Sequence, residues 1–319
     1  MRIYAFALAM ALMVLRCAQA AAPTIELTPV QVAPQVYYFQ GQAGMASAQN
    51  KGFMSNAGFV VTRDGVVVFD ALATPVLGAA MVKAIARVTA QPVRRVVVSH
   101  YHADHFYGLQ AFKQQGAEIW AHSAGKATLA SDFTQTRLAE RRTSLAPWVD
   151  DATRLLPADR WLEFGKDKAI KFELGGTHFT LLDVGGAHSP EDVMLYVEEP
   201  QVLFAGDLFF TGRIPFVGDA DSKAWLQALA RFPAGPKVVI PGHGPASTNP
   251  QADLALTTSY LLYLREQMGK AVADMQTFDE AYRGVDWSRF AQYPAFKDAN
   301  RINAYGTYLL LERESLGKQ

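Results

Sequence analysis

A valine-rich run that ends in a histidine cluster is the feature of this sequence that most restricts its fold. Residues 93–98, Val-Arg-Arg-Val-Val-Val, predict a buried strand because β-branched residues dominate them. The next residues, 99–108, read Ser-His-Tyr-His-Ala-Asp-His-Phe-Tyr-Gly. Strand ends of an α/β sheet point into the crevice where ligands bind, so we interpret this segment as part of a metal site. Its candidate ligands, which cannot complete the site alone, are His100, His102, Asp104 and His105.

Three further candidate ligands follow apolar strands later in the chain. His188 and His243 each come after a predicted strand, in a turn that contains glycine. Asp207 follows the apolar run 202–205, with one glycine between them. Glycine permits the tight turns and the close backbone approach that such a site needs. Four strand ends therefore deliver candidate ligands to one edge of the fold.

The chemistry of these seven groups predicts a pair of metal ions. Imidazole and carboxylate ligands without a thiolate suit Zn²⁺, with Fe or Mn as alternatives. Seven protein groups are too many for one tetrahedral ion. We predict that one ion is held by His100, His102 and His188 and the other by Asp104, His105 and His243, with Asp207 bridging them. Two ions roughly 3.5–4 Å apart can hold a hydroxide between them and polarise the bond that it attacks.

The order of these residues resembles the metallo-β-lactamase superfamily of metal hydrolases. The resemblance rests on His100-x-His102-x-Asp104-His105, followed by His188, Asp207 and His243, and covers about residues 35–250. It implies a four-layer αββα sandwich, a dinuclear site and hydrolysis by metal-bound hydroxide. It also implies that Asp70, after an early strand, orients a metal ligand. A turn or cap role stays open for Asp70 and for Asp192.

A closer similarity concerns residues 206–221, 241–246 and 300–305, which look like exported zinc hydrolases of the sulfur-oxidation and quinoprotein-relay type. The resemblance identifies the family more than the activity. We expect a periplasmic enzyme that hydrolyses a small-molecule ester, thioester or lactone, with Asp104 and Asp207 as catalytic residues. Asp104, a metal ligand, would also accept or move a proton. β-Lactam hydrolysis is the main alternative. The other alternative is a non-catalytic metal-binding partner in a periplasmic redox system.

The pattern of strands and helices predicts an α/β fold in two strand-rich halves. In the first half the expected strands are 36–39, 56–61, 65–70, 93–98 and 118–121, with helices at 75–89 and 106–115. In the second half, which starts near Trp161, they are 168–174, 178–184, 193–197, 202–205 and 237–240, with a helix at 222–231. Residues 21–34 are expected to be an irregular arm, and residues 123–160 to be helical and then a loop.

The two ends of the chain are expected to differ in character from the sandwich. Residues 1–20 have a basic start, an apolar centre and an Ala-x-Ala site, which are typical of a secretory signal peptide. Residues 21–250 then form the sandwich domain. From residue 251 to 319 only helices are predicted, at 252–275, 278–283 and 297–314, and they form a C-terminal helical extension. The protein is therefore expected to be periplasmic or secreted.

Composition excludes several classes of protein. Lys and Arg together number 30, as do Asp and Glu, and no basic cluster suggests a nucleic-acid binder. No apolar stretch long enough to span a membrane follows the N-terminus. The single cysteine, Cys17, would leave with the signal peptide, so no thiolate remains for a metal or a nucleophile. The oligomeric state stays open.

A few residues keep two interpretations. We expect His122 and His178 to be ordinary strand residues, because neither fits the order of the ligands. Arg213 is expected either to contact an anionic group of the substrate or to form a surface salt bridge. Residues 41–51 form either a flap over the site or the tip of a hairpin. Some aromatic residues near the ligands would line the site, while most would simply pack in the core.

Overall fold

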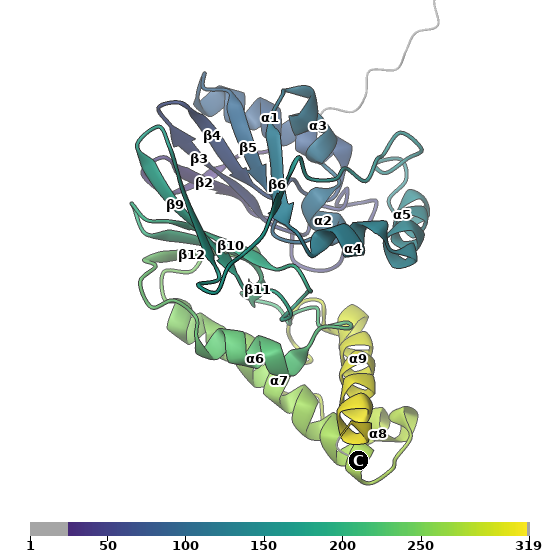
Figure 1. The fold of residues 1–319 in the computed structure, drawn as a ribbon. Coiled ribbons are helices and arrows are strands. Elements are labelled where there is room, and N and C mark those ends of the chain that lie inside the picture. Colours follow the sequence, from purple (N-terminus) through teal and green to yellow (C-terminus); the bar gives the residue numbers. More distant parts are fainter. Residues whose placement is uncertain (1–24, 318–319) are drawn as a thin grey trace, which may run out of the picture.

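Two β-sheets packed face to face form the centre of the protein, in a computed structural model that describes residues 25–317 (Figure 1). The first sheet runs in the order β1-β2-β3-β4-β5-β6-β7 and the second in the order β12-β11-β10-β9-β8. The strands of the first sheet are β1 (Val30–Ala33), β2 (Val36–Phe39), β3 (Ala57–Thr62), β4 (Gly65–Phe69), β5 (Val93–Val97), β6 (Glu118–His122) and β7 (Arg160–Leu162). Those of the second are β8 (Ala169–Leu174), β9 (Thr177–Asp183), β10 (Val193–Val197), β11 (Val202–Phe210) and β12 (Val238–His243).

Helices cover the outer face of each sheet, which confirms the predicted αββα sandwich. Helices α1 and α3 pack on the first sheet, and α6 and α7 cover the second (Figure 1). The helices are α1 (Pro75–Val88), α2 (Ala103–Phe106), α3 (Leu109–Gln114), α4 (Gly125–Ala130), α5 (Asp132–Ser144), α6 (Ser222–Ala230), α7 (Pro250–Ala273), α8 (Phe278–Gly284) and α9 (Phe296–Leu316).

The layers explain why the central strands read as continuous apolar runs. In β4, Val66 and Val68 belong to the core under the helices, while Val67 and Phe69 belong to the core between the sheets. Both faces of this strand are therefore removed from water. Each fully buried side chain of this kind contributes about 1.5–3 kcal/mol. Strands β4, β5, β6 and β7 run parallel, so their carboxyl ends lie at one edge of the sheet.

Two predictions for the first half are wrong in detail. The irregular arm predicted for residues 21–34 contains β1, which pairs antiparallel with β2. This strand has four residues, of which one is the polar Gln31, so it was too short to recognise from its pattern. The helix predicted for residues 106–115 is divided into α2 and α3 at Gly108. A Cβ at Gly108 would lie 1.9 Å from the Ala71 carbonyl oxygen, so this close contact requires glycine.

Two predictions for the second half also need correction. The strand near Trp161 is β7, which pairs with β6 and belongs to the first sheet. The strand predicted for residues 202–205 continues to Phe210 as β11, so Asp207 lies within a strand and not at its end. The register against β12 shifts around Gly206, which has a φ of 52°. A glycine and a carboxylate inside the apolar run conceal this continuation in the sequence.

The three C-terminal helices pack on each other and on the second sheet, as the predicted helical extension requires. A buried polar network joins them: the Tyr260 hydroxyl donates to Asn300 Oδ1 (2.8 Å), and Asn303 Nδ2 donates to the Tyr260 hydroxyl (3.0 Å). Thr277 and Glu280 cap the start of α8 by bonding each other's backbone. The extension is therefore held by specific polar contacts in addition to its apolar core.

The predicted signal peptide, residues 1–20, lies outside the described residues. Between residues 25 and 317, the protein has no helix whose length and apolar character would let it cross a membrane.

Close packing of α9 on the segment after β11 predicts a sensitive position. A Cβ at Gly306 would lie 1.6 Å from the Gly218 carbonyl oxygen, so Gly306→Ala must push α9 away. We expect this substitution to lower the free energy of unfolding by about 1–3 kcal/mol in urea titrations. The control is Gly284→Ala, because nothing lies within 4 Å of a Cβ there. Equal stability of the two variants would contradict the prediction.

Candidate metal centre

All seven candidate ligands lie together where the end of β5 meets the ends of β11 and β12. Their side chains form two groups. Within each group, the potential ligand atoms all lie within 4.8 Å of one another. The groups are His100, His102, His188 and Asp207, and Asp104, His105 and His243. The structure thus brings together the residues of both predicted sites. Asp104 and His105 project from α2, which begins before the helix predicted at residue 106.

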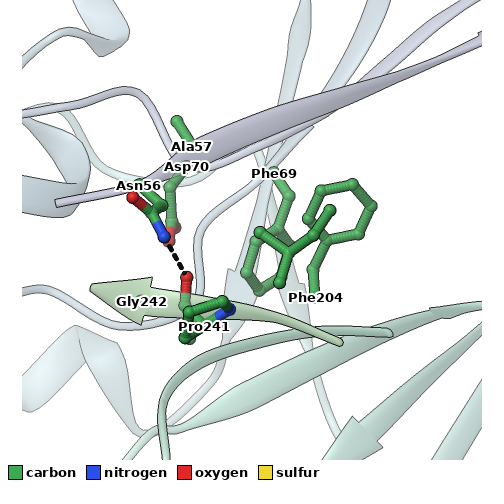
Figure 2. Close-up of a pocket in the computed structure, with 9 residues that line it drawn as sticks. Asn56, Ala57, Phe69, Asp70, Phe204, Pro241 and Gly242 are labelled. Carbon is green, nitrogen blue, oxygen red and sulfur yellow. Dashed lines mark hydrogen bonds between the residues drawn. The ribbon is translucent and has the colours of Figure 1, made fainter. Parts of the chain in front are cut away.

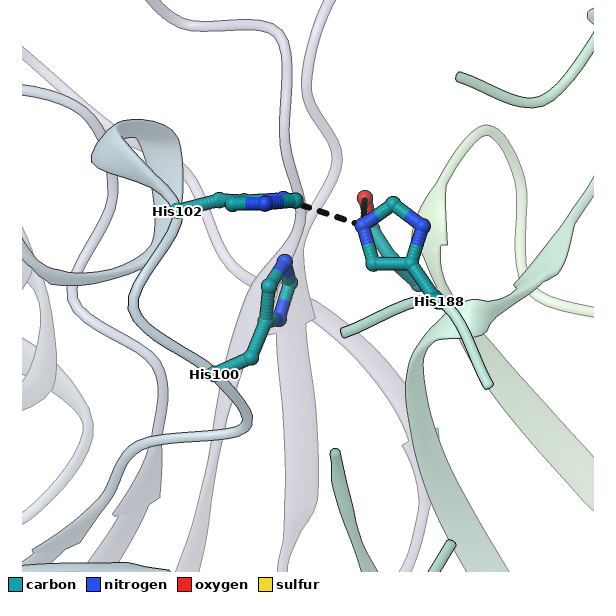
Figure 3. A group of neighbouring side chains, drawn as sticks. His100, His102 and His188 are labelled. Atoms are coloured by element: carbon teal, nitrogen blue, oxygen red, sulfur yellow. Dashed lines mark hydrogen bonds and ion pairs between the residues drawn. The ribbon is translucent and has the colours of Figure 1, made fainter. Parts of the chain in front are cut away.

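Three imidazoles of the first group converge on one point (Figure 3). His188 Nε2 and His102 Nδ1 face each other at 3.0 Å. The His100 ring lies at right angles to that of His188, with 4.9 Å between ring centroids. Its Nδ1 contacts the Ser99 hydroxyl at 2.9 Å, while its buried Nε2 makes no hydrogen bond within the described residues. An unpartnered buried nitrogen aimed at two other imidazoles fits a metal ligand.

The second group has the ring orientation that metal-binding histidines usually show. His105 Nδ1 contacts Asp70 Oδ2 at 2.9 Å, and His243 Nδ1 contacts the Met54 carbonyl oxygen at 2.8 Å. These contacts leave both Nε2 atoms facing Asp104 Oδ2, at 3.5 Å and 3.3 Å. A histidine that donates one ring N–H to such a partner keeps the other nitrogen for the metal. Asp70 thus occupies the orienting position that the sequence resemblance implies.

Asp207 lies between the two groups. Its Oδ1 is 3.2 Å from His105 Nε2, and its Oδ2 is 3.4 Å from His188 Nε2 and 3.3 Å from His243 Nε2. The carboxylate therefore contacts nitrogens of both groups. The seven side chains offer only nitrogen and oxygen ligand atoms. Such a set fits two divalent cations of the Zn²⁺, Fe or Mn type.

The electrostatics of the two groups differ. Burial lowers the pKa of His188 to about 3, and burial also holds the pKa of His100 well below its usual value. Burial opposes protonation of His105 and His243 as well, but Asp207 and Asp104 raise the pKa of both rings. His100 and His188 are therefore neutral imidazoles, whereas His105 and His243 hold protons that a cation must displace.

Asp70 connects the first sheet to the site. Besides its contact with His105, it accepts hydrogen bonds from the Ser99 backbone N–H (2.7 Å) and the Ser99 hydroxyl (2.8 Å). Ser99 in turn contacts His100, so one carboxylate supports a histidine of each group. Burial raises the pKa of Asp70, while His105 acts in the opposite direction.

Residues 54–56 form a second support for the ligands, which was not predicted from the sequence. The Ser55 hydroxyl donates to the Asp104 carbonyl oxygen (2.5 Å), and Asn56 Nδ2 donates to the carbonyl oxygens of Pro241 (2.8 Å) and Gly244 (2.7 Å). Figure 2 shows the Asn56–Pro241 bond beside a small void of about 10 Å³. No local pattern signals these contacts, because the Asn56–Pro241 pair is separated by 185 positions.

The residues with two interpretations can now be assigned. Asp192 accepts from the Ser189 N–H (2.7 Å) and hydroxyl (2.6 Å), so it has the turn role. His122 contacts Asp183 at 3.5 Å, away from the two groups, and His178 is exposed on β9. The surface salt bridge proposed for Arg213 is wrong, since the side chain is 1% exposed and has no ion pair among the described residues.

Two aromatic side chains press directly on the ligands. The Phe210 ring stacks on His243, with 5.1 Å between centroids and 3° between planes. Trp225 meets His188 edge-on at 5.1 Å. Both aromatics are fully buried, so they exclude water from the inner side of the site and restrict the two imidazoles.

Comparisons with known proteins agree with this geometry. A family model described as the metallo-beta-lactamase superfamily matches residues 50–243, more than half of the chain. A curated relative, metallo-beta-lactamase IND-1 of Chryseobacterium indologenes, is 21% identical over 199 residues, which are 60% of this chain and 73% of the relative.

Solved structures share the fold at low identity. The sec-alkylsulfatase Pisa1 from Pseudomonas sp. superposes with a TM-score of 0.66 at 18% identity, over 89% of this chain and 50% of the sulfatase. This chain therefore spans only half the length of that protein. A metallo-beta-lactamase from Pontibacter korlensis gives a TM-score of 0.55 at 23% identity, over 74% of this chain and 99% of its own. A match over 89% of the chain must extend into the C-terminal helices.

The contact between β11 and β12 predicts a position that controls Asp207. A Cβ at Gly242 would lie 1.9 Å from Asp207 Oδ1 and 2.9 Å from the Asp207 backbone nitrogen. We expect Gly242→Ala to displace the carboxylate and to weaken metal binding at least roughly tenfold, measured by competition with a chelator. Gly165→Ala is the matched control, because a Cβ there meets nothing within 4 Å. Unchanged metal affinity in Gly242→Ala would disprove this expectation.

The different protonation of the two groups predicts two pH dependences of metal binding. Because the pKa values of His105 and His243 are raised, binding at their group must release protons, so its affinity should increase as the pH rises. His100 and His188 are already neutral, so binding at their group releases fewer protons and its affinity should change less. Zn²⁺ titrations at several pH values would separate the two classes. His243→Ala should remove the pH-dependent class, and loss of the other class instead would contradict the assignment.

Proposed function

Since the chain belongs to the metallo-β-lactamase superfamily, whose members are metal-dependent hydrolases, we propose that it is an exported hydrolase with two Zn²⁺ ions. Its substrate would be a small-molecule ester, thioester or lactone. The proposed export rests on residues 1–20, whose composition is that of a secretory signal peptide. N-terminal sequencing of the mature protein tests it, and retention of residues 1–20 would refute it.

One observation carries the two-metal proposal: a single carboxylate lies against both histidine groups. Asp207 is within 3.4 Å of His188 on one side and within 3.3 Å of His105 and His243 on the other. A site for one cation needs no such shared group. The arrangement supports Asp207 as the bridging ligand, with three further residues for each ion.

The chain's own residues have separate tasks in the proposed reaction. Two divalent cations bound here would supply the activation of water near neutral pH and the polarisation of the scissile carbonyl. Asp104 is 16% exposed against 4% for Asp207, so Asp104 is the carboxylate that a substrate and its water can reach. We assign to it the acceptance or transfer of a proton. Phe210 and Trp225 keep water away from the opposite side.

Esters, thioesters or lactones are our first candidates, and residues 206–221, 241–246 and 300–305, which resemble exported zinc hydrolases, identify the family more than the substrate. The match to IND-1 favours β-lactam hydrolysis as the second candidate. The superfamily fold alone does not select between them, because substrate choice depends on the side chains around the site. A metal-binding module without catalysis is the third possibility that an experiment must separate.

A substrate panel on metal-loaded protein tests the proposal. We expect two equivalents of Zn²⁺ by elemental analysis and turnover of a thioester, lactone or ester that a chelator abolishes and Zn²⁺ restores. The panel includes a chromogenic cephalosporin and a secondary alkyl sulfate. Turnover of the cephalosporin alone would establish the β-lactam alternative. Full metal loading with no turnover of any class would support a binding module.

Removal of the bridging carboxylate is the sharper test. Asp207→Ala should lower the metal content below two equivalents and reduce kcat/KM by at least about a hundredfold. Asp183→Ala is a matched control, since Asp183 pairs with His122 and Lys168 outside the two groups. A variant without Asp207 that keeps two ions and full activity would exclude the bridging role.

A further inference from the structure

Residues 41–53 form a loop that leads into Met54, whose carbonyl oxygen contacts His243 Nδ1 at 2.8 Å, and we call it the rim loop. Its ends are joined by a hydrogen bond from Gln42 N to the Phe53 carbonyl oxygen (3.0 Å). Asn50 orders its interior: Oδ1 accepts from Ser47 N (2.9 Å), and Nδ2 donates to the Met45 carbonyl oxygen (2.9 Å). The loop therefore has a defined shape of its own. What needs explanation is how this shape is kept in place beside the ligands.

Two side chains from separate parts of the protein hold the rim loop. Trp148 Nε1, from the segment after α5, donates to the Ala48 carbonyl oxygen (2.8 Å). Arg213, from the segment after β11, donates through Nη1 to the Gly44 carbonyl oxygen (2.9 Å). Its Nη2 also lies 3.8 Å from Met45 Sδ. One attachment thus comes from the first half of the chain and the other from the second.

Arg213 is an unusual choice for a structural contact. Its side chain is 1% exposed, yet within residues 25–317 no carboxylate forms an ion pair with it. Its Nε donates to the Ile214 carbonyl oxygen (3.3 Å), and Nη1 lies 3.4 Å from His243 Nδ1. The guanidinium therefore touches the rim loop and a candidate metal ligand at once. Burial of a cation is unfavourable, and attraction to the more distant Asp207 and Asp104 offsets this only in part, so the position of Arg213 must be maintained by its surroundings.

The C-terminal helices provide those surroundings. On α9, Asn303 Oδ1 accepts from the Val217 backbone N–H (2.8 Å), and its Nδ2 donates to the Pro215 carbonyl oxygen (2.8 Å). Gly306 on the same helix lies directly against Gly218. The segment that follows Arg213 is thus bound along its length to α9. Through this segment the helical extension is connected to Arg213 beside the metal centre.

We propose that Arg213 is a positioning residue that fixes the rim loop against the metal centre, with α9 holding Arg213 in place through Asn303. The proposal rests on the proposed hydrolase function only for its kinetic consequence. Arg213 donates to a loop carbonyl and takes no part in the reaction. A fixed rim loop lowers the conformational entropy lost when a substrate binds, so the loop contributes to KM more than to kcat.

Arg213→Met is the principal test, because Met has a similar length without charge. Met fills a similar volume, so the core around residue 213 stays packed while the hydrogen bond to the Gly44 carbonyl oxygen is lost. In zinc-loaded protein we expect amide hydrogen exchange at residues 43–48 to become faster by roughly tenfold or more, because the loop loses a hydrogen bond from a charged donor. KM should rise by a similar factor while kcat changes less than about threefold, with zinc content unchanged.

Three further variants keep the test decisive. Arg213→Lys retains the charge with a less directional donor, so its exchange rates should lie between those of the wild type and Arg213→Met. Asn303→Ala leaves Arg213 intact and should still accelerate exchange in the rim loop. Arg160→Met is the matched control, since Arg160 lies on β7 over the Trp120 ring and should leave the rim loop unchanged.

Some results would overturn the proposal. Unchanged exchange at residues 43–48 in Arg213→Met would show that the arginine does not hold the loop. A KM effect restricted to substrates with an anionic group would show that Arg213 contacts the substrate itself. A loss of zinc would assign it to the metal ligands. If the wild-type protein turns over no substrate, the proposed function fails, but the exchange measurements still decide the role of Arg213.

Discussion

The burial of two carboxylates among five imidazoles is the interaction on which the rest of this structure depends. Asp207 contacts the rings of His105, His188 and His243 within 3.4 Å while being almost fully removed from water. Burying ionised groups costs several kcal/mol each unless opposite charges accompany them. Two divalent cations would satisfy this requirement, as would the protons that the raised pKa values of His105 and His243 retain. The surrounding fold must keep these groups close in either state.

The two sheets share this task. The first contributes β5 and α2, which carry the histidine cluster, and the second contributes β11 and β12, which carry Asp207 and His243. Neither sheet alone holds a complete group of ligands. Contacts between them therefore control the site: Asn56 joins the start of β3 to the end of β12, and the Met54 carbonyl oxygen orients the His243 ring. This division explains why the apolar core between the sheets is also a support for the metal centre.

Local patterns predicted the regular part of the fold well. The apolar run of β4, the amphipathic α1 and the long C-terminal helices were all evident, because burial on one or two faces leaves a periodic signal. Short or interrupted elements were not. Strand β1 has four residues, β7 has three, and the break between α2 and α3 depends on the contact of Gly108 with Ala71. The last two are fixed by partners far away in the sequence, whereas β1 pairs with the neighbouring β2 and is too short to show a pattern.

The sequence by itself determined the chemistry of this protein: which seven side chains are available to bind metal, that Cys17 is its only cysteine, and that the seven adjoin apolar runs. The division into two groups around Asp207 and the role of Asp70 were predicted, but only the tertiary structure gave their distances. It also decided that residues 54–56 support the ligands, and that Arg213 is buried between the rim loop and α9. The physical reason is that ligand type is a property of each residue, whereas distance, burial and hydrogen-bond partners arise from segments that meet only in the folded chain.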